Sequence, residues 1–260
     1  MKRYLITLLP SAAAVLALAG IASAQTADEV VEKHLAALGG RAAVGRLTSR
    51  KLTGTVTLTT PNGDIYGSVE AYAKAPNKSR TFMQLDLSAF GAGTVAIDQR
   101  FDGATGFVMN PMQGNTEITG NQLENLRNSL FPHTLLNYKE RGVKLDVLPS
   151  QKVGDRDTIV LALTPKAGSV VTMFIDAQTY LLVKAVTKVD MPTAGGLVEQ
   201  TTELSDYREV DGVKVAFQIR NSTFQPGNST PLQSVSIKAA KIEHNIPMED
   251  SMFVRPPGGL

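Results

Sequence analysis

The chain has 260 residues, with 26 lysines and arginines against 24 acidic residues, and it contains no cysteine. The absence of cysteine excludes disulfides, a thiolate nucleophile and cysteine-bound metal. The near balance of charge gives no sign of a phosphate-binding groove or of a polybasic membrane patch, so we expect no nucleic-acid partner.

The first 24 residues have the form of a secretory signal peptide. Lys2 and Arg3 form a short positive start, an apolar run extends from residue 5 to residue 21, and Ala22-Ser23-Ala24 is a small-residue cleavage site. Pro10 interrupts the run, and what remains is short for a helix that needs about 20 apolar residues to span a bilayer. We expect cleavage after Ala24, export to the periplasm and no stable membrane span.

We expect residues 25–260 to form a single domain. This part of the chain has no Ser/Gly or Pro tract, no block of like charge and no repeat of fixed period. All-β sheets and barrels of this size often form one domain. Removal of the signal peptide leaves 24 basic residues, which equals the 24 acidic ones.

Helical spacing is present at two places. The first predicted helix is capped at Thr26 or Asp28, ends at Gly39-Gly40 and carries an apolar stripe of Val30, Val31, Leu35 and Leu38. The second covers residues 119–131, stops before Pro132, and carries Leu123, Leu126 and Leu130. Residues 133–142 allow a further helical turn.

The remaining segments alternate with a period of two and predict strands. They are separated by short, turn-rich connections, and Asp211-Gly212 between two alternating runs predicts a tight hairpin. The predicted strands cover residues 51–60, 66–75, 80–87, 94–101, 105–111, 143–149, 157–165, 169–178, 180–189, 196–210, 213–224 and 232–245.

Short connections allow only antiparallel neighbours, because a parallel crossover needs a dozen or more residues. A twisted sheet of more than about 10 strands curls, splits or closes. The predicted fold is therefore mainly β (α+β). It is a large curled antiparallel sheet with a concave face, an N-terminal helix and a central helical segment that can cover the mouth of that face.

Six segments in order resemble the LolA/LolB-type family of periplasmic lipoprotein carriers, in its broad outer-membrane lipoprotein-sorting form. They are residues 27–40, 67–80, 101–114, 174–186, 205–219 and 242–258. The resemblance implies an incomplete antiparallel β-barrel, or half-barrel, with a helical lid and an apolar cavity for acyl chains. It implies neither a cofactor nor catalytic residues.

Apolar side chains on the strands and on the central segment are the candidate ligand-binding residues. Small side chains beside flexible methionines favour a cavity, because a close-packed core does not leave such volume. The alternative is that the same residues form an ordinary core. The candidates for lipid binding are Val56, Leu58, Val69, Ala71, Met83, Leu85, Phe107, Met109, Phe131, Leu135, Val171 and Met173.

No motif for catalysis or metal binding is found in the sequence. His34, His133 and His244 are far apart and lack the spacing of a metal site, so we expect none of them to be a ligand or a catalytic residue. Asp98 and Asp102 are more typical of solvated turns than of a hydrolytic pair. We expect no enzyme activity, no cofactor and no metal.

The leading functional hypothesis is a monomeric periplasmic carrier or chaperone that shields the acyl chains of a lipid or an acylated lipoprotein. Donor and acceptor proteins of the cell envelope are further expected partners. A second hypothesis is an envelope sensor or scaffold that uses the same cavity or a sheet edge to bind another protein. A third is a small enzyme acting in the cavity.

Overall fold

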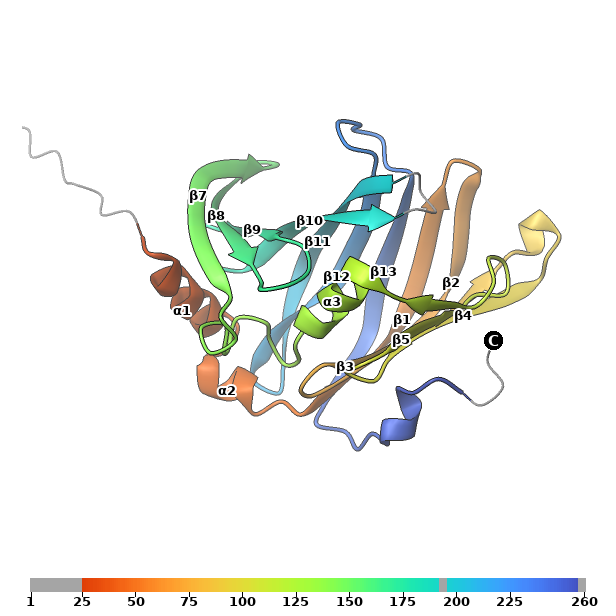
Figure 1. The fold of residues 1–260 in the computed structure, drawn as a ribbon, viewed down its shortest axis with the longest axis horizontal. Helices are drawn as coiled ribbons and strands as arrows, with labels where there is room; N and C mark the ends of the chain where they lie inside the picture. The colour runs from red at the N-terminus through yellow and green to blue at the C-terminus, as the bar shows by residue number, and fades with distance from the viewer. Residues whose placement is uncertain (1–24, 192–195, 257–260) are drawn as a thin grey trace, which may run out of the picture.

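The computed structural model describes residues 25–191 and 196–256. The predicted signal peptide, residues 1–24, lies outside the described residues. The described chain forms one 13-stranded sheet with few helices (Figure 1). The elements are α1 (Ala27–Ala37), α2 (Arg41–Gly45), β1 (Ser49–Thr60), β2 (Gly63–Lys74), β3 (Lys78–Asp86), η1 (Ser88–Phe90), β4 (Thr94–Phe101), β5 (Gly106–Met109), β6 (Thr116–Ile118), α3 (Gly120–Asn128), β7 (Lys144–Val153), β8 (Arg156–Thr164), β9 (Val171–Asp176), β10 (Leu182–Met191), β11 (Gly196–Val210), β12 (Val213–Phe224), β13 (Gln233–His244) and η3 (Asp250–Met252).

The strand order explains why the sheet is an open barrel. The order is β6-β5-β4-β3-β2-β1-β13-β12-β11-β10-β9-β8-β7, and every neighbouring pair is antiparallel. The first and last strands of the chain pair in the middle of the sheet, and the two free edges, β6 and β7, are consecutive in sequence. The segment that joins these edges, residues 119–143, must therefore cross the opening of the barrel.

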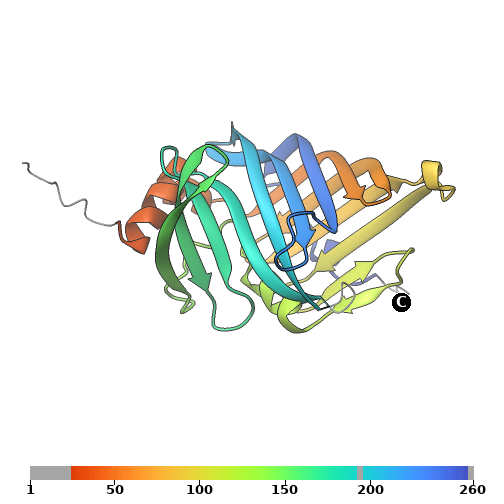
Figure 2. The ribbon, with the colours of Figure 1, turned by 90° about the horizontal axis from the view of Figure 1, so that it is seen from above.

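The sheet curls so that its two arms rise on either side of α3 (Figures 1 and 2). Glycines permit close backbone approach between neighbouring strands of β1 to β3 and β13. A Cβ on Gly54 would lie 2.2 Å from the carbonyl oxygen of Lys238, and one on Gly67 would lie 2.0 Å from that of Gln84. The register between β1 and β13 also shifts between Thr53 and Gly54. Glycines and bulges at such positions bend a sheet toward closure.

Alternation along the strands places the main apolar clusters on the concave face. One cluster spans β1 to β4, β12 and β13 and includes Val56, Val69 and Leu85, each 1% exposed. A second cluster joins β8 and β9 to the buried face of α1. A smaller group of Val160, Phe174 and Val183 lies on the opposite face of β8 to β10.

The helix α1 is fixed at both ends. Thr26 and Glu29 form a capping box at its start. At its end the carbonyl oxygen of Leu38 accepts a hydrogen bond of 2.8 Å from the backbone N–H of Lys214. A Cβ on Gly39 would lie 2.1 Å from the carbonyl oxygen of Gly212, so only glycine allows the helix end to sit against the β11–β12 turn. The helix therefore closes one end of the half-barrel.

The predicted fold class is confirmed: the sheet is antiparallel, curled and open, and a helical segment covers its mouth. The Asp211-Gly212 hairpin is also present, with both residues at positive φ (53° and 77°), as a two-residue type I′ turn requires.

Three details differ from the sequence-based expectation. The short helix α2 and the three-residue strand β6 had not been predicted, because neither is long enough to show a periodic pattern. Residues 134–142 form turns rather than a helix. Strand β7 continues past Pro149. An edge strand tolerates a proline there, because the register shifts between Leu148 and Gln151.

Among the described residues, none of the helices is long and apolar enough to cross a membrane.

Candidate functional site

The helix α3 bridges the two arms of the open sheet. On one side Arg127 donates a hydrogen bond of 2.9 Å to the carbonyl oxygen of Ala104 in the β4–β5 turn. On the other side Asn125 exchanges two hydrogen bonds with Ser169 (2.8 and 3.2 Å), and Asn128 donates to the carbonyl oxygen of Ala167 at 2.8 Å, both in the β8–β9 connection. Since no residue of α3 is buried, polar contacts contribute strongly to holding this helix over the opening.

Beneath α3 lies a cavity of about 420 Å³, which we call the lid cavity. Its wall combines apolar side chains, most of them from β8 to β11, with polar groups, and carries no Asp, Glu, Lys or Arg. The apolar part comprises Leu130, Pro132, Leu163, Pro165, Val171, Met173, Leu182, Ala185 and Leu204; the polar part includes Ser129, Thr187, Gln200 and Thr202.

A second cavity of about 460 Å³, the rim cavity, lies on the other side of α3. It is lined by residues of β4 to β6 and of β10 to β12, and its wall is more polar, with Gln99, Gln122 and Asn221 beside Val108 and Met191. The rim cavity and the lid cavity have four lining residues in common: Asn125, Ser129, Gln200 and Thr202. The two cavities therefore adjoin beneath the helix.

A third cavity of about 200 Å³, the inner cavity, lies toward the end of the half-barrel that α1 closes. Its lining includes Arg50 of β1, His34 of α1 and His133. It adjoins the lid cavity, because both are lined by Pro132, His133, Leu182 and Leu204. The three cavities thus follow one another along the concave face.

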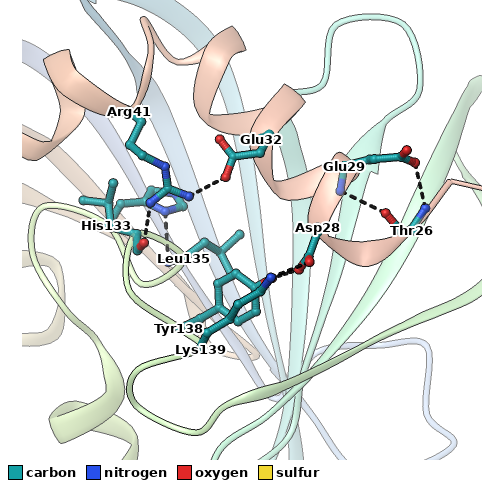
Figure 3. Close-up of polar contacts among 10 residues, drawn as sticks. Thr26, Asp28, Glu29, Glu32, Arg41, His133, Leu135, Tyr138 and Lys139 are labelled. Atoms are coloured by element: carbon teal, nitrogen blue, oxygen red, sulfur yellow. Dashed lines mark hydrogen bonds and ion pairs between the residues drawn. The ribbon is translucent and has the colours of Figure 1, made fainter.

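The segment after α3 is held at the closed end by α1 and α2 (Figure 3). Asp28 accepts hydrogen bonds from Tyr138 and Lys139, and Arg41 of α2 donates to the carbonyl oxygen of Leu136 at 2.5 Å. Arg41 also pairs with Glu32 at 2.5 Å. These contacts fix the position from which His133 points into the interior.

His34 and His133 form a hydrogen-bonded chain in which every proton can be assigned. The backbone N–H of Leu135 donates to Nδ1 of His133 (3.2 Å), so the His133 proton is on Nε2 and points to Nε2 of His34 at 3.2 Å. The His34 proton is then on Nδ1 and is donated to the carbonyl oxygen of Tyr180 at 2.7 Å. Both rings are neutral in this arrangement. Burial lowers both pKa values, that of His133 to about 3, with further lowering from His34 and Arg50.

Arg50 contacts the third histidine. Its Nε donates to Nε2 of His244 at 3.1 Å, and its guanidinium lies over the ring of Phe131, 5.3 Å from the ring centroid. Nδ1 of His244 then carries the proton and faces Asp211 Oδ2 at 3.4 Å, without the geometry of a hydrogen bond. The three histidines, far apart in sequence, therefore come together in the fold: His34 and His133 line the inner cavity, and His244 contacts Arg50 at its wall.

The predicted lipid-binding residues fall into three groups. Val171 and Met173 line the lid cavity. The register of β5 against β4 places Phe107 and Met109 on the face opposite Val108, with Phe107 beneath Arg255. The others pack in the two concave clusters without lining any of the three cavities: Val56, Leu58, Val69, Ala71, Met83, Leu85, Phe131 and Leu135.

Sequence patterns held a signal for the burial of His34, and for Arg50, which the sequence analysis did not single out. His34 falls on the apolar stripe of the first helix, and Arg50 shares a strand face with Leu52 and Val56. A polar residue on an apolar face is an expected buried polar group.

The carboxylates have structural roles. Burial alone would raise the pKa of Asp98, but hydrogen bonds from Arg80 and Arg100 outweigh it and hold this pKa below its usual range. Asp102 accepts hydrogen bonds from the backbone of the β4–β5 turn. No cluster of three or more His, Asp or Glu side chains suited to a metal ion occurs within residues 25–191 and 196–256.

The open curled sheet with a helical lid over adjoining cavities is a LolA-like fold. A LolA superfamily protein of Nitrosomonas europaea aligns with a TM-score of 0.55 at 14% identity, over 89% of this chain and 99% of that one. A putative outer membrane lipoprotein-sorting protein domain of Vibrio parahaemolyticus aligns with a TM-score of 0.53 at 13% identity, over 86% and 94%. A DUF1329 family protein of Desulfovibrio piger gives 0.54 at 14% identity, over 87% and 96%. No family model and no curated protein matches the sequence.

Proposed function

We propose that the protein is a non-catalytic periplasmic carrier that binds the acyl chain of a lipid or lipoprotein in the lid cavity. The observation that carries this proposal is the apolar wall of the lid cavity beneath a helix held largely by polar contacts. The likeness to structures described as LolA superfamily and lipoprotein-sorting proteins supports the fold on which such a function rests.

The size of the lid cavity suits a chain. Ligand pockets usually have volumes of about 300–1,000 Å³, and the lid cavity alone has about 420 Å³. Each buried methylene contributes about 0.8 kcal/mol. A 16-carbon chain would gain on the order of 10 kcal/mol before ordering costs.

Release requires that α3 moves. The contacts of Asn125 and Asn128 with the β8–β9 connection are hydrogen bonds at the margin of the sheet. Water can replace such bonds at a net cost of about 1 kcal/mol each. We therefore assign α3 the role of a lid that opens on the β8–β9 side for uptake and transfer.

A second candidate function is docking of another envelope protein as an added strand. β7 is a ten-residue edge strand, and its Val147 and Leu148 are 42% and 36% exposed. Such an edge offers unpaired backbone groups to an extended partner segment. The bulge at Pro149 limits this pairing to the first half of the strand.

The test is native mass spectrometry of protein prepared from the cell envelope without detergent, together with binding of a fluorescent fatty-acid probe. We expect bound lipid in the wild type and weaker probe binding in Ala185→Trp, because Ala185 lines the lid cavity. Lys188→Trp, on the exposed face of the same strand, is the matched control. Equal probe binding by both variants, or a wild type that binds no lipid and no probe, would contradict the proposal.

A further inference from the structure

The inner cavity contains a cation whose contacts in the described structure include no carboxylate. Arg50 donates through Nε to the neutral ring of His244 and lies over Phe131. Burial lowers the pKa of Arg50 to about 10, and no acidic group offsets this effect. At neutral pH the guanidinium remains charged.

The surroundings of Arg50 hold no negative charge at the cavity wall. The residues that line the inner cavity include Arg50, Lys214, His34 and His133, and none of them is acidic. Asp211, the carboxylate nearest to this group through His244, faces the opposite nitrogen of that ring and has a side chain that is 61% exposed. The cavity therefore has a positive potential that the described side chains leave uncompensated.

An arrangement of this kind costs stability. A partly desolvated charge without a counter-ion is unfavourable, and a guanidinium has five N–H donors, of which this structure pairs the one on Nε with a protein acceptor. The remaining donors are on Nη1 and Nη2, where they match the two oxygens of a carboxylate or phosphate.

The position of this cation relative to the lid cavity indicates the shape of the missing anion. The inner and lid cavities are both lined by Pro132, His133, Leu182 and Leu204. The lid cavity, in turn, is lined by no Asp, Glu, Lys or Arg, and β8 to β10 line it with Leu163, Val171, Met173, Leu182 and Ala185 beside the single hydroxyl of Thr187. A molecule that fits both has an anionic end in the inner cavity and an apolar chain in the lid cavity.

We infer that Arg50 binds the anionic head group, a carboxylate or a phosphate monoester, of a single-chain amphiphile whose tail occupies the lid cavity. This inference rests on the proposed carrier function for the tail and adds the charge of the head and the residue that binds it. It also gives the ligand one orientation, with the head toward α1 and the tail beneath α3.

The experiment compares probes of equal chain length at pH 8: palmitate, hexadecyl phosphate and the neutral hexadecanol, each by displacement of a fluorescent neutral-chain probe. Acetate and inorganic phosphate test whether the head binds without a chain. We expect wild type to prefer the two anionic chains over hexadecanol by about 10-fold to 100-fold, the value of a charged hydrogen-bonded pair. Acetate and phosphate alone should not displace the probe at millimolar concentration.

The variants are Arg50→Met, Arg50→Lys and the exposed control Arg46→Met. Arg50→Met should lower the affinity for palmitate to that for hexadecanol and leave hexadecanol binding unchanged. Arg50→Lys should keep a reduced preference for anions, and Arg46→Met should behave as wild type. The thermal midpoint of Arg50→Met should equal or exceed that of wild type, because an uncompensated charge is removed.

Failure of this inference differs from failure of the proposed function. Equal binding of palmitate and hexadecanol by wild type overturns the head-group site and leaves the carrier function standing. Displacement of the probe by acetate or phosphate alone overturns the inference that the ligand is an amphiphile and indicates a site for a free anion. Binding of none of the 16-carbon probes overturns both. A lower thermal midpoint and loss of hexadecanol binding in Arg50→Met, with Arg50→Lys equally impaired, would show a purely structural arginine and overturn the inference.

Discussion

Nε2 of His34 lies 3.2 Å from Nε2 of His133, although 99 residues separate the two histidines in sequence. One proton occupies this contact, and the outer nitrogens are bonded to the carbonyl oxygen of Tyr180 and to the N–H of Leu135. A second proton on either ring would set two N–H groups against each other or against the N–H of Leu135. The pair therefore joins α1 to the central segment only while both rings are neutral.

This geometry predicts a loss of stability in acid. The pKa of His133 falls from 6.5 to about 3 on folding, mainly through burial, so between these values the unfolded chain binds more protons than the folded one. The free energy of unfolding then decreases as the pH falls below about 6.5, by up to about 1.4 kcal/mol per pH unit for each such histidine. Urea denaturation at pH 7, 6 and 5 measures this slope.

His133→Gln should flatten that slope because it removes one titrating ring. The glutamine amide can still donate a hydrogen bond to His34, so the contact between α1 and the central segment is retained. Lys33→Gln, next to His34 on α1, removes a positive charge outside the histidine pair and should leave the slope as in wild type. An unchanged slope in His133→Gln would show that this histidine is not the source of the acid sensitivity.

Ala71→Trp should destabilise the protein by about 1–3 kcal/mol, the usual cost of overpacking. Ala71 packs against the concave cluster of Val69 and Leu85 and lines none of the three cavities, so a large side chain has no free volume to enter. Ser68→Trp, on the exposed face of the same strand, should change stability by less than about 0.5 kcal/mol. Chemical denaturation of both variants measures the difference. A fully stable Ala71→Trp protein would instead reveal free volume on this face, as expected of the ligand-binding surface that the sequence predicts there.

Asn125→Ala should loosen the lid while the sheet remains folded. The substitution removes two hydrogen bonds to Ser169, and each contributes about 1 kcal/mol. Amide hydrogen exchange in α3 should accelerate by about tenfold or more, with little change in β8 to β13. Asn121→Ala, at an exposed position of the same helix, is the control. Equal exchange in the two variants would mean that α3 is held by other contacts.

Gly168→Ala should disturb the lid by a different route. Gly168 has a φ of +96°, and a Cβ there would lie 2.9 Å from Oδ1 of Asn125 and 3.0 Å from Nδ2 of Asn128. Gly40 has the same φ of +96° with nothing within 4 Å of a Cβ. In both alanine variants the free energy of unfolding should decrease by about 1 kcal/mol or more through backbone strain. Only Gly168→Ala should also increase hydrogen exchange in α3, and an increase in both would assign the effect to strain alone.

Much of the fold could be predicted from the sequence because its signals are local. The alternation along residues 213–224, the Asp211-Gly212 turn and the stripe on residues 30–38 each depend on neighbours a few positions away. Short connections then forced antiparallel neighbours, and the number of strands forced curvature. The curled antiparallel sheet follows from these facts.

The site could be predicted only in part. Val171 and Met173 line the lid cavity, whereas Val56, Val69 and Leu85 pack closely on the same concave face. An apolar face looks alike in sequence whether its neighbours fill the space above it or leave it empty. That difference depends on which side chains from other strands meet there.

The sequence by itself determined the longer strands, the hairpin turns and the helices α1 and α3, because hydrophobic alternation and turn chemistry act within a few residues. The tertiary structure alone decided that β1 pairs with β13, that the barrel opens between β6 and β7, and that Arg50 and His133 meet at one cavity. These relationships arise from the curvature accumulated over the whole sheet and from the path of residues 119–143 across its opening. No local pattern encodes either of them, since both depend on contacts between residues far apart in the chain.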